Sequence, residues 1–526
     1  MTKVLISDKL SEDAVKILES RGVDVTFDPS LGKDPEKLKA LIGDYDGLAI
    51  RSATKVTSEV IAAAPKLKVV GRAGIGVDNV DIPAATAAGI AVMNTPFGNS
   101  VTTAEHAIAM MFALAREIPQ ANASTHAGKW EKSRFMGVEL YGKTLGLVGC
   151  GNIGSIVADR AQGLKMKVIA FDPFLTEDRA IELGVEAVDL DTLFKRADFI
   201  TLHTPLTDKT RNILNANAMA KMKKGVRIVN CARGGLVDEA ALLDALESGQ
   251  VAGAALDVFE TEPATDNPLF GRDDVVCTPH LGASTSEAQE NVAVQIADQI
   301  ADYLLVGAVT NALNMPSVSA EEAPRLKPYI TLAEKIGTLA GQVVDTPLQS
   351  IELTYAGAVS ELKVAPMTSA ALAGVLRPRL EDVNLVNAPA VAKDRGIAMK
   401  EATTATCPNY GSTLTVSLTT PTGVHTFVGA VFGGEPRITR IGEIRLEASF
   451  AKHMLFIRNE DTPGLIGALG QALSEAGINI ATFHLGRKDQ GGRAIALVAT
   501  DQEVAEDVLK KIHALPQVAS AQALNF

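Results

Sequence analysis

The sequence predicts an α/β protein in which two doubly wound parallel-sheet domains precede an α+β domain and a terminal domain of β-α-β-β-α-β order. Three observations support this fold class. Short β-rich runs alternate with helical patterns from Lys3 to about Val276, which is typical of parallel sheets. A stretch that contains Pro316, Pro324 and two glutamates then interrupts the alternation. Beyond it, helices and β-rich segments mix, and a βαββαβ pattern closes the chain.

The composition limits what the chain can be. Its 526 residues are 47% hydrophobic and 21% charged, a balance that predicts a folded chain of several domains. Lys and Arg number 50 against 62 Asp and Glu, and the net charge of −12 argues against nucleic acid or an anionic membrane as partner. The four cysteines lie far apart, without metal or disulfide spacing, which favours free thiols in a reducing compartment.

Targeting signals are not evident. The first residues carry no signal-peptide pattern, and the most apolar stretch, Ala107 to Ala115, is too short to span a bilayer. We therefore expect a cytoplasmic protein without a membrane segment.

The first parallel sheet is expected between residues 3 and 92. Its β-rich runs cover residues 4–6, 47–50, 67–70 and 90–92, with helical patterns at 11–20 and 57–64. A segment from Ser100 to Gln120 follows and is predicted as one helix, because Ser and Thr can cap its start and most of its faces are apolar. Such a helix is expected to be buried between domains or subunits.

The second parallel sheet is expected from Leu145 to about Val276, with glycine-rich and proline-containing turns at its strand ends. A helix from Glu287 to Leu305 precedes the interrupted stretch. The terminal domain is predicted from six segments: 454–458, 465–476, 478–485, 493–500, 504–514 and 518–524. Their order is that of a ferredoxin-like fold.

A glycine-rich turn indicates a cofactor site. Residues 145–148 form a buried-strand run that leads into Gly149-Cys150-Gly151-Asn152-Ile153-Gly154, and a helical pattern follows. In this setting the glycines permit a tight turn and close approach of a pyrophosphate, while the start of the helix supplies N–H donors. Asp172 ends the next strand, where a carboxylate suits the adenosine ribose hydroxyls and repels a 2′-phosphate. The sequence therefore predicts NAD rather than NADP.

Three polar residues follow the ends of other predicted strands, where ligands gather in open α/β sheets. They are Arg233, Glu262 and His280. Removing a hydride from a secondary alcohol carbon needs a base for the hydroxyl proton, a cation for a neighbouring carboxylate and an acid that tunes the base. His280, Arg233 and Glu262 match these three roles, since the planar fork of arginine can hold a carboxylate.

These motifs, in this order, resemble those of the D-2-hydroxyacid dehydrogenase family over residues 1–316. The resemblance implies that His280 takes the hydroxyl proton, that Arg233 orients the substrate carboxylate and that Glu262, the acid directly before a proline, raises the histidine pKa. It implies NAD contacts by Gly149, Gly151, Asn152, Ile153, Gly154, Asp172, Thr204, Cys231, Ala232, Arg233, Asp257 and His280. Among these, Asp257 matches the family's contact to the nicotinamide carboxamide, and Thr204 a contact through the backbone.

The resemblance also implies how the first two domains are divided. Residues 1–97 plus 288–316 would form a substrate-binding domain, and residues 98–287 an NAD-binding domain, both Rossmann-like. The apolar helix from Ser100 then crosses between the domains and contributes to a dimer contact. A homo-oligomer, either a dimer or a tetramer, is expected.

Two arginines limit the range of substrates that the sequence predicts. Arg51 and Arg72 both follow predicted strand ends that face the cleft, and two cations there suit a dianionic phosphate as well as a carboxylate. With the segment from Gly71 to Asp81, they resemble the branch of the family that oxidises 3-phosphoglycerate at the start of L-serine synthesis. The substrate contacts that this resemblance implies are Arg51, Ser52, Arg72, Gly74 and Lys132.

Other functions stay open at this point. A hydroxypyruvate/glyoxylate or 2-oxoglutarate reductase on the same scaffold has less need of Arg51 and Arg72. A non-catalytic corepressor of dehydrogenase-like fold needs no intact catalytic residues. His106 lacks a second ligand at metal spacing, so no metal site is predicted.

The C-terminal half resembles the long form of the same branch. Residues 317–452 match its intervening domain and residues 453–526 its amino-acid-binding ACT domain. Asp461 is placed to take an amino group, and Asn479 is expected to come from a paired domain. L-serine is the expected effector, although the domain could also serve only to join subunits.

Overall fold

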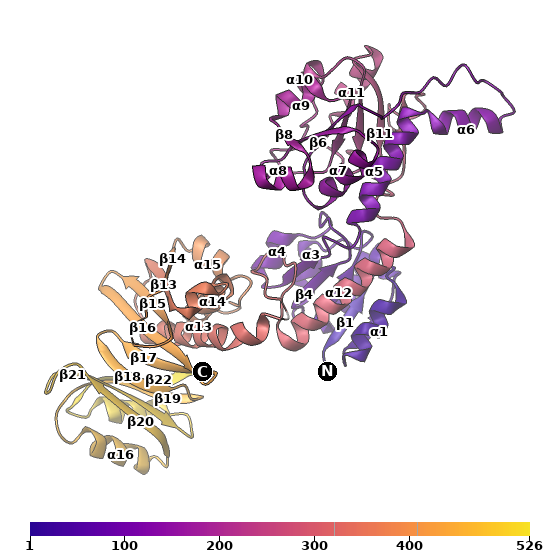
Figure 1. Cartoon of the computed structure of the whole chain (residues 1–526). Coiled ribbons are helices and arrows are strands. Elements are labelled where there is room, and N and C mark those ends of the chain that lie inside the picture. The colour runs from indigo at the N-terminus through magenta and orange to yellow at the C-terminus, as the bar shows by residue number, and fades with distance from the viewer. Residues whose placement is uncertain (320, 408) are drawn as a thin grey trace. The chain divides into compact units, whose positions relative to one another are not determined.

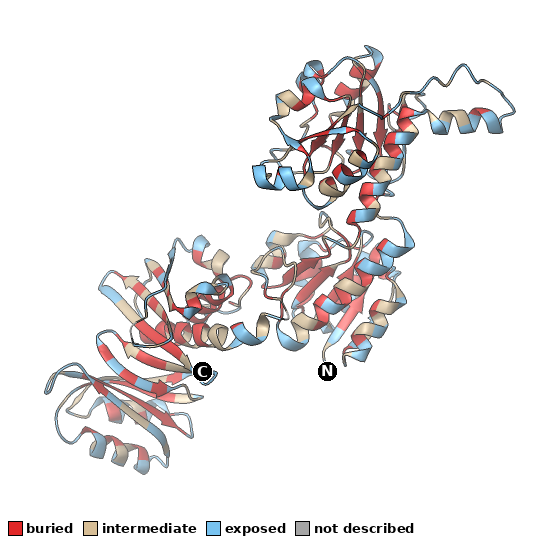
Figure 2. Cartoon of the chain, viewed as in Figure 1, coloured by how far each residue is buried: buried red, intermediate tan, exposed pale blue. Residues whose placement is uncertain are grey.

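The computed structural model describes residues 1–319, 321–407 and 409–526, and it confirms the predicted fold class (Figure 1). The chain divides into two compact units. One combines Met1–Asn94 with Ile296–Phe526, and the other is Thr95–Gln295. Buried residues are concentrated in the strands and on the inner faces of the helices in Figure 2.

Five parallel strands form the first sheet, in the order β2-β1-β3-β4-β5. Its elements are β1 (Lys3–Ile6), α1 (Glu12–Ser20), β2 (Asp24–Phe27), α2 (Pro35–Leu41), β3 (Gly47–Ile50), α3 (Ser58–Ala62), β4 (Val69–Arg72), α4 (Ile82–Ala87) and β5 (Ala91–Asn94). Ile50 of β3 pairs with Arg72 of β4. Arg51 and Arg72 therefore leave the sheet at the same edge.

The second part of α12 (Ser286–Val306) packs closely against this sheet. A side chain at Gly71 would collide with Ile296 and Ile300, so glycine is required for this approach. Both ends of this helix lie within one residue of the predicted bounds, Glu287 and Leu305.

Seven parallel strands form the second sheet, in the order β12-β11-β10-β9-β6-β7-β8. Its strands are β6 (Thr144–Val148), β7 (Lys167–Phe171), β8 (Glu186–Ala187), β9 (Phe199–Leu202), β10 (Val226–Asn230), β11 (Val251–Leu256) and β12 (Val275–Cys277). Its helices are α5 (Ser100–Ala115), α7 (Asn152–Gly163), α8 (Glu177–Leu183), α9 (Leu190–Arg196), α10 (Ala216–Lys221) and α11 (Glu239–Glu247). The strand order reverses between β6 and β9, and ligands bind at such switch points in open α/β sheets.

The predicted helix from Ser100 to Gln120 is two helices. α5 ends at Ala115, and α6 (Ile118–His126) starts after Glu117, whose φ of 52° is left-handed. Pro119 explains the break, because proline lacks an N–H for the helix ladder and disfavours helical backbone at the residue before it.

The third sheet has the order β14-β13-β15-β16-β17-β18 and pairs antiparallel except between β13 and β14. Its elements are α13 (Ala323–Val343), β13 (Ser350–Gly357), α14 (Ala365–Leu376), α15 (Ala388–Asp394), β14 (Ala398–Thr404), β15 (Ser412–Thr420), β16 (Gly423–Phe432), β17 (Glu435–Ile441) and β18 (Ile444–Ser449).

The last sheet is antiparallel with the order β20-β21-β19-β22. The predicted βαββαβ order is confirmed by β19 (His453–Glu460), α16 (Leu465–Glu475), β20 (Ile480–Arg487), β21 (Arg493–Thr500), α17 (Glu506–His513) and β22 (Val518–Asn525). One face of this sheet packs under α16 and α17. The other face joins a single hydrophobic core with α13, α14 and the third sheet, in which Ile336, Ile438 and Phe456 are fully or almost fully buried.

Within the part of the chain that the structure describes, no helix has both the length and the apolar character needed to cross a membrane. The four cysteines are all unpaired thiols.

Candidate active site

The glycine-rich turn connects β6 to α7 as the sequence predicts. Gly149 has a φ of 95°, and a Cβ there would lie 2.5 Å from the carbonyl oxygen of His203. Gly154 packs against the Gly149 carbonyl, while nothing lies within 4 Å of the position that a Cβ of Gly151 would take. The turn is therefore closely packed at Gly149 and Gly154 and open at Gly151. Asn152 and Ile153 start α7, whose N-terminal N–H groups suit the diphosphate of a dinucleotide.

Asp172 is fixed beside this turn by two backbone groups. Its Oδ2 accepts a hydrogen bond of 2.8 Å from the N–H of Cys150, and its Oδ1 accepts one of 2.8 Å from the N–H of Phe174. The carboxylate thus sits next to the glycine-rich turn with lone pairs left for ribose hydroxyls. These residues fit the adenosine diphosphate half of NAD.

The backbone carbonyl of His203 lies close to Gly149 of the turn, and the sequence analysis does not predict this contact. Its ring Nε2 lies 2.9 Å from the Thr201 hydroxyl, and burial lowers its pKa to about 4. The imidazole is therefore neutral at physiological pH. Half-buried Thr204 follows His203 just after the end of β9. The partner glycine lies far away in sequence, so local patterns give no signal for His203.

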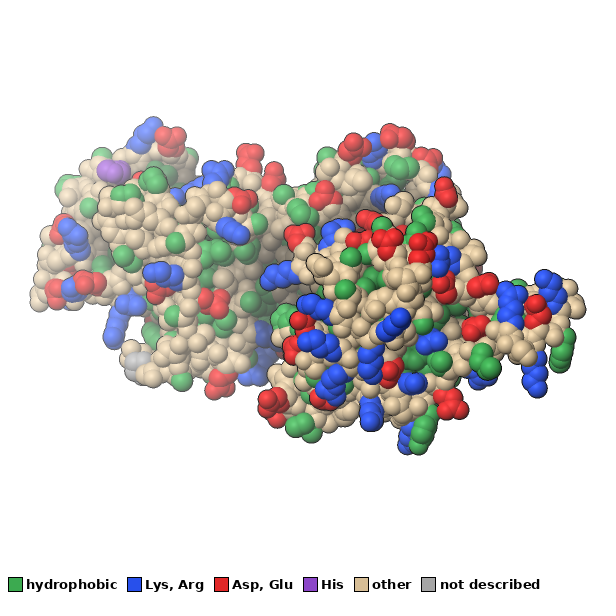
Figure 3. Space-filling view, turned by 90° about the horizontal axis from the view of Figure 1, so that it is seen from above, with side chains coloured by type: hydrophobic (Ala, Val, Ile, Leu, Met, Phe, Trp, Pro, Cys, Tyr) green, Lys and Arg blue, Asp and Glu red, His purple; other side chains and the backbone are tan. Residues whose placement is uncertain are grey.

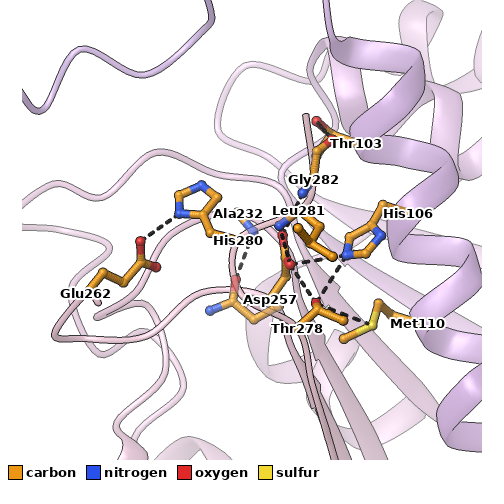
Figure 4. A network of polar contacts seen from close by, with 11 residues as sticks. Thr103, His106, Met110, Ala232, Asp257, Glu262, Thr278, His280, Leu281 and Gly282 are labelled. Atoms are coloured by element: carbon orange, nitrogen blue, oxygen red, sulfur yellow. Dashed lines mark hydrogen bonds and ion pairs between the residues drawn. The ribbon is translucent and has the colours of Figure 1, made fainter. Parts of the chain in front are cut away.

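His280 and Glu262 form a close pair (Figure 4). Nδ1 of His280 lies 2.7 Å from Oε2 of Glu262, and Oε1 of Glu262 accepts a hydrogen bond of 3.0 Å from the N–H of Phe259. The hydrogen bond with Glu262 raises the pKa of His280, against opposing effects of burial and of the Arg233 charge. Burial alone would raise the pKa of Glu262, but the contact with His280 and the hydrogen bond from the N–H of Phe259 together outweigh it, and the net shift is downward. The pair thus stabilises a protonated imidazole.

Arg233 lies on a loop that Asn230 holds. The side-chain Nδ2 of Asn230 donates to the carbonyl of Arg233 at 2.9 Å, and its Oδ1 accepts from the N–H of Ala232 at 3.1 Å. Asn230 is 2% exposed at the end of β10, and Cys231 beside it is also buried. A buried amide with both ends occupied fixes the loop that presents Arg233.

Asp257, which the family resemblance assigns to the nicotinamide carboxamide, is held in a network of hydrogen bonds. Its side chain is 0% exposed. Its carboxylate accepts hydrogen bonds from the backbone N–H groups of Leu281 and Gly282, at 2.7 and 2.8 Å, and from the Thr278 hydroxyl at 2.6 Å. Nε2 of His106 lies 3.2 Å from the same carboxylate. In the structure Asp257 therefore anchors the loop that carries His280.

His106, Cys231 and Asp257 place ligand atoms within 4.8 Å of one another, a set that could hold a metal ion. Burial raises the pKa of the Cys231 thiol strongly, so this sulfur is protonated at neutral pH. The four hydrogen-bonding groups around Asp257 account for the cluster without a metal.

The candidate substrate residues lie mostly in the unit that contains the first sheet. The N–H of Arg51 donates to Oδ2 of buried Asp8 at 2.6 Å, and Nδ2 of Asn79 donates to the Arg51 carbonyl at 2.6 Å. Ser52 follows on the surface. Gly74 has a φ of 134°, and its missing side chain leaves space for the Arg72 guanidinium. The turn after β3 is thus held by Asp8 and Asn79, and the sequence analysis identified neither residue.

The candidate effector residues lie at opposite ends of the last sheet. β19 and β20 both pair antiparallel with β21, so they run in the same direction. Asp461 follows the end of β19, whereas Asn479 precedes the start of β20. Oδ2 of Asp461 accepts from Arg487 at 2.6 Å and from the N–H of Gly491 at 3.0 Å, and Nδ2 of Asn479 donates to Asp501 at 2.7 Å. One chain does not bring the two residues together.

Comparisons with known protein families match three segments of the chain. Residues 108–282 match the model described as "D-isomer specific 2-hydroxyacid dehydrogenase, NAD binding domain". Residues 325–442 match "D-3-phosphoglycerate dehydrogenase intervening domain", and residues 453–517 match "ACT domain". Together with the glycine-rich turn and Asp172, the first match identifies NAD as the cofactor.

Curated relatives extend the likeness over the whole chain. The D-3-phosphoglycerate dehydrogenases of Bacillus subtilis and Methanocaldococcus jannaschii are 42% and 44% identical to it, each over 100% of both chains. Among solved structures, the TT0316 protein of Thermus thermophilus matches 59% of this chain and 100% of its own, with 33% identity and a TM-score of 0.55. The apo D-lactate dehydrogenase of Escherichia coli matches 60% of this chain and 100% of its own, with 31% identity and a TM-score of 0.52. The chain therefore belongs to the D-3-phosphoglycerate dehydrogenase family of NAD-dependent D-2-hydroxyacid dehydrogenases.

Proposed function

We propose that this chain oxidises D-3-phosphoglycerate to 3-phosphohydroxypyruvate with NAD, the first step of L-serine biosynthesis. The contact between His280 and Glu262 carries this proposal, because it joins a base to a tuning carboxylate in the unit that holds the glycine-rich turn. The full-length likeness to D-3-phosphoglycerate dehydrogenases supports the choice of substrate.

The mechanism assigns one task to each residue. NAD, when bound, supplies the acceptor for the hydride of the substrate C–H bond. Nδ1 of His280 is hydrogen-bonded to Glu262. Nε2 is therefore the ring nitrogen that accepts the hydroxyl proton as the carbonyl forms. Arg233 holds the substrate carboxylate beside that carbon. In the reverse direction, protonated His280 returns the proton to the carbonyl oxygen.

The substrate phosphate is assigned to Arg51 and Arg72. Both leave the first sheet at one edge, and their combined charge matches a phosphate dianion. Ser52 and Gly74 belong to the same two turns. A reductase for unphosphorylated 2-oxo acids would not require this pair.

We expect Arg51→Ala and Arg72→Ala each to lower kcat/KM for 3-phosphoglycerate by roughly 10- to 100-fold. This follows from the ~1.5–3 kcal/mol of one hydrogen bond to a charged group. Oxidation of unphosphorylated D-glycerate should change little, because its hydride and proton transfers keep their residues. Initial rates of NADH formation with both substrates measure the difference.

Lys37→Ala is a matched control, since it removes an exposed cation of the same domain that pairs with Asp28. Equal losses with both substrates would contradict the phosphate assignment and favour a hydroxypyruvate/glyoxylate or 2-oxoglutarate reductase. If the native chain formed no NADH with either substrate, a non-catalytic binding protein would be the better interpretation.

A homo-oligomer, a dimer or tetramer, is part of this proposal. α6 and the segment after it expose large apolar side chains, with Trp130 at 87%, Met136 at 80% and Ile118 at 51%. This arm projects at the right edge of Figure 3, where hydrophobic and charged side chains are both exposed. Such exposure is typical of a contact surface. Lys132 lies on this arm, and we propose that it contacts the substrate of a neighbouring subunit. We also propose that the protein is located in the cytoplasm.

We further propose that L-serine regulates the enzyme by binding to the ACT domain. Because Asp461 and Asn479 lie at opposite ends of one sheet, a site that uses both needs two paired ACT domains. Asp461 would take the serine ammonium and Asn479 of the second copy would complete the site. Arg487 now neutralises Asp461, so the ammonium would have to share or replace this contact.

Asp461→Ala is expected to relieve inhibition by L-serine and to leave uninhibited turnover close to the native value, because the ACT domain holds none of the proposed catalytic residues. Inhibition curves and isothermal titration calorimetry with L-serine measure the two effects. Glu506→Ala, which removes an exposed carboxylate of the same domain, serves as the control. Absence of binding and inhibition at millimolar serine in the native chain would refute the regulation and leave the catalytic proposal intact.

A further inference from the structure

One face of α5 contacts the loop that carries His280 (Figure 4). Thr103, His106 and Met110 are spaced three and four residues apart and therefore share a side of the helix. The hydroxyl of Thr103 donates to the carbonyl of Gly282 at 2.8 Å. Met110 places its sulfur 3.7 Å from the hydroxyl of Thr278. The helix thus contacts both ends of the segment from Thr278 to Gly282.

His106 occupies the centre of this contact. Its Nε2 lies 3.2 Å from Oδ1 of Asp257 and 3.3 Å from the Thr278 hydroxyl oxygen. The single proton of that hydroxyl goes to Asp257, so the oxygen can only accept from His106. Nε2 of His106 therefore carries a hydrogen that it donates to both oxygens.

Asp257 transmits this contact to the catalytic histidine. Its carboxylate accepts the N–H groups of Leu281 and Gly282, and its backbone carbonyl accepts the N–H of His280 at 2.9 Å. His280 itself has a φ of 57°, a left-handed conformation that is unfavourable for a residue with a side chain. Three consecutive N–H groups held by one residue maintain that conformation.

We propose that His106 is a positioning residue for His280. Its Nε2 hydrogen bonds hold Asp257 and Thr278 in place, and these in turn hold the loop in the conformation in which the His280 ring meets Glu262. The role of His280 in turnover rests on the proposed function, whereas the positioning of its ring does not. The charged groups that act on His280 are Glu262, Asp257 and Arg233.

The test compares His106→Gln with His106→Asn. The glutamine amide nitrogen reaches about as far as Nε2 of histidine and can donate to Asp257, whereas the asparagine amide is one methylene shorter. Both side chains are polar and fit the half-buried site, so the pair separates reach from polarity. Met111→Leu, a buried change in the same helix that removes none of the hydrogen bonds among His106, Asp257 and Thr278, is the matched control.

The first readout is the pKa of the His280 imidazole, from NMR titration of the full chain labelled with ¹³C-histidine. The chain has eight histidines, and His280→Asn identifies the signal. We expect the pKa to fall towards its ordinary value of 6.5 in His106→Asn and to stay raised in His106→Gln. The second readout is turnover: we expect kcat to fall about 10- to 100-fold in His106→Asn, with the acidic limb of its pH profile moved to lower pH.

An unchanged His280 pKa in a folded His106→Asn variant would overturn the proposal. If that variant does not fold, Thr278→Val removes the adjoining hydroxyl with little change of shape and should lower the same pKa; an unchanged value there would also overturn it. Equal effects of Gln and Asn would show that reach is irrelevant and would likewise count against positioning. Failure of the proposed function is distinguishable, because the native chain would then lack turnover while the NMR comparison still reports the position of the ring.

Discussion

His280→Ala is expected to lower kcat for NAD-dependent oxidation of 3-phosphoglycerate by about 10²- to 10⁴-fold, the usual contribution of a positioned acid-base group. Without the imidazole, the hydroxyl proton has no acceptor at the point where the carbonyl forms. NADH binding should persist, because the glycine-rich turn and Asp172 are held by other backbone groups. Stopped-flow rates and fluorescence titration with NADH separate the two effects.

The role of His280 also predicts the direction in which the rates of the native chain change with pH. Neutral His280 is needed for oxidation, and Glu262 raises its pKa, so oxidation should increase as the pH rises through that raised value. The reverse reduction needs the protonated ring and should decrease over the same interval. His513→Ala, a change at an exposed position of α17, is a control that should leave both profiles unchanged. Near-native turnover in His280→Ala would remove this residue from the mechanism.

Arg233→Ala is expected to produce the second large loss, a fall in kcat/KM of about 10²- to 10³-fold, comparable to the removal of one preorganised donor to a developing charge. The guanidinium is assigned both the binding of the carboxylate and the alignment of the reacting carbon. Arg233→Lys should recover only part of the loss, because an ammonium cannot form the two parallel hydrogen bonds of the guanidinium fork. Steady-state kinetics of the three proteins measure both effects.

Arg196→Ala provides the control for loss of a cation in the same unit, since Arg196 forms an exposed ion pair with Glu186. Its kinetics should remain native. If Arg233→Lys were fully active, a point charge would suffice and bidentate binding of the carboxylate would be wrong. If Arg233→Ala were fully active, the carboxylate would have to be held elsewhere.

The fold and the polar residues at strand ends could be predicted because their signals are local. A buried-strand run followed by Gly149-x-Gly151 and a helix is read within one segment, and the same holds for Arg233 and His280 after their strands. The contact between Glu262 and His280 could be anticipated once these residues matched a known pattern. The roles of these residues in turnover remain predictions that the variants above can test.

The supporting residues could not be predicted, because each acts over a long distance in sequence. Asp8 meets Arg51 across 43 residues, and His106 meets Thr278 across 172. Such pairs leave no periodicity or motif in either segment. The contact of Asp257 with the nicotinamide carboxamide, which the family resemblance implies, stays a prediction, whereas its hydrogen bonds to the N–H groups of Leu281 and Gly282 had no signal in the sequence.

The single hydrophobic core that α13 and the third sheet share with the last sheet affects how regulation should be studied. Met454, Phe456 and Leu497 of the last sheet are almost fully buried in this core. A chain cut after Lys452 would lose these side chains and turn the inner surface of the intervening domain into an exposed apolar patch, which favours aggregation. Truncation would therefore report damage to the neighbouring domain rather than release from an effector, and single substitutions such as Asp461→Ala are the sounder probe.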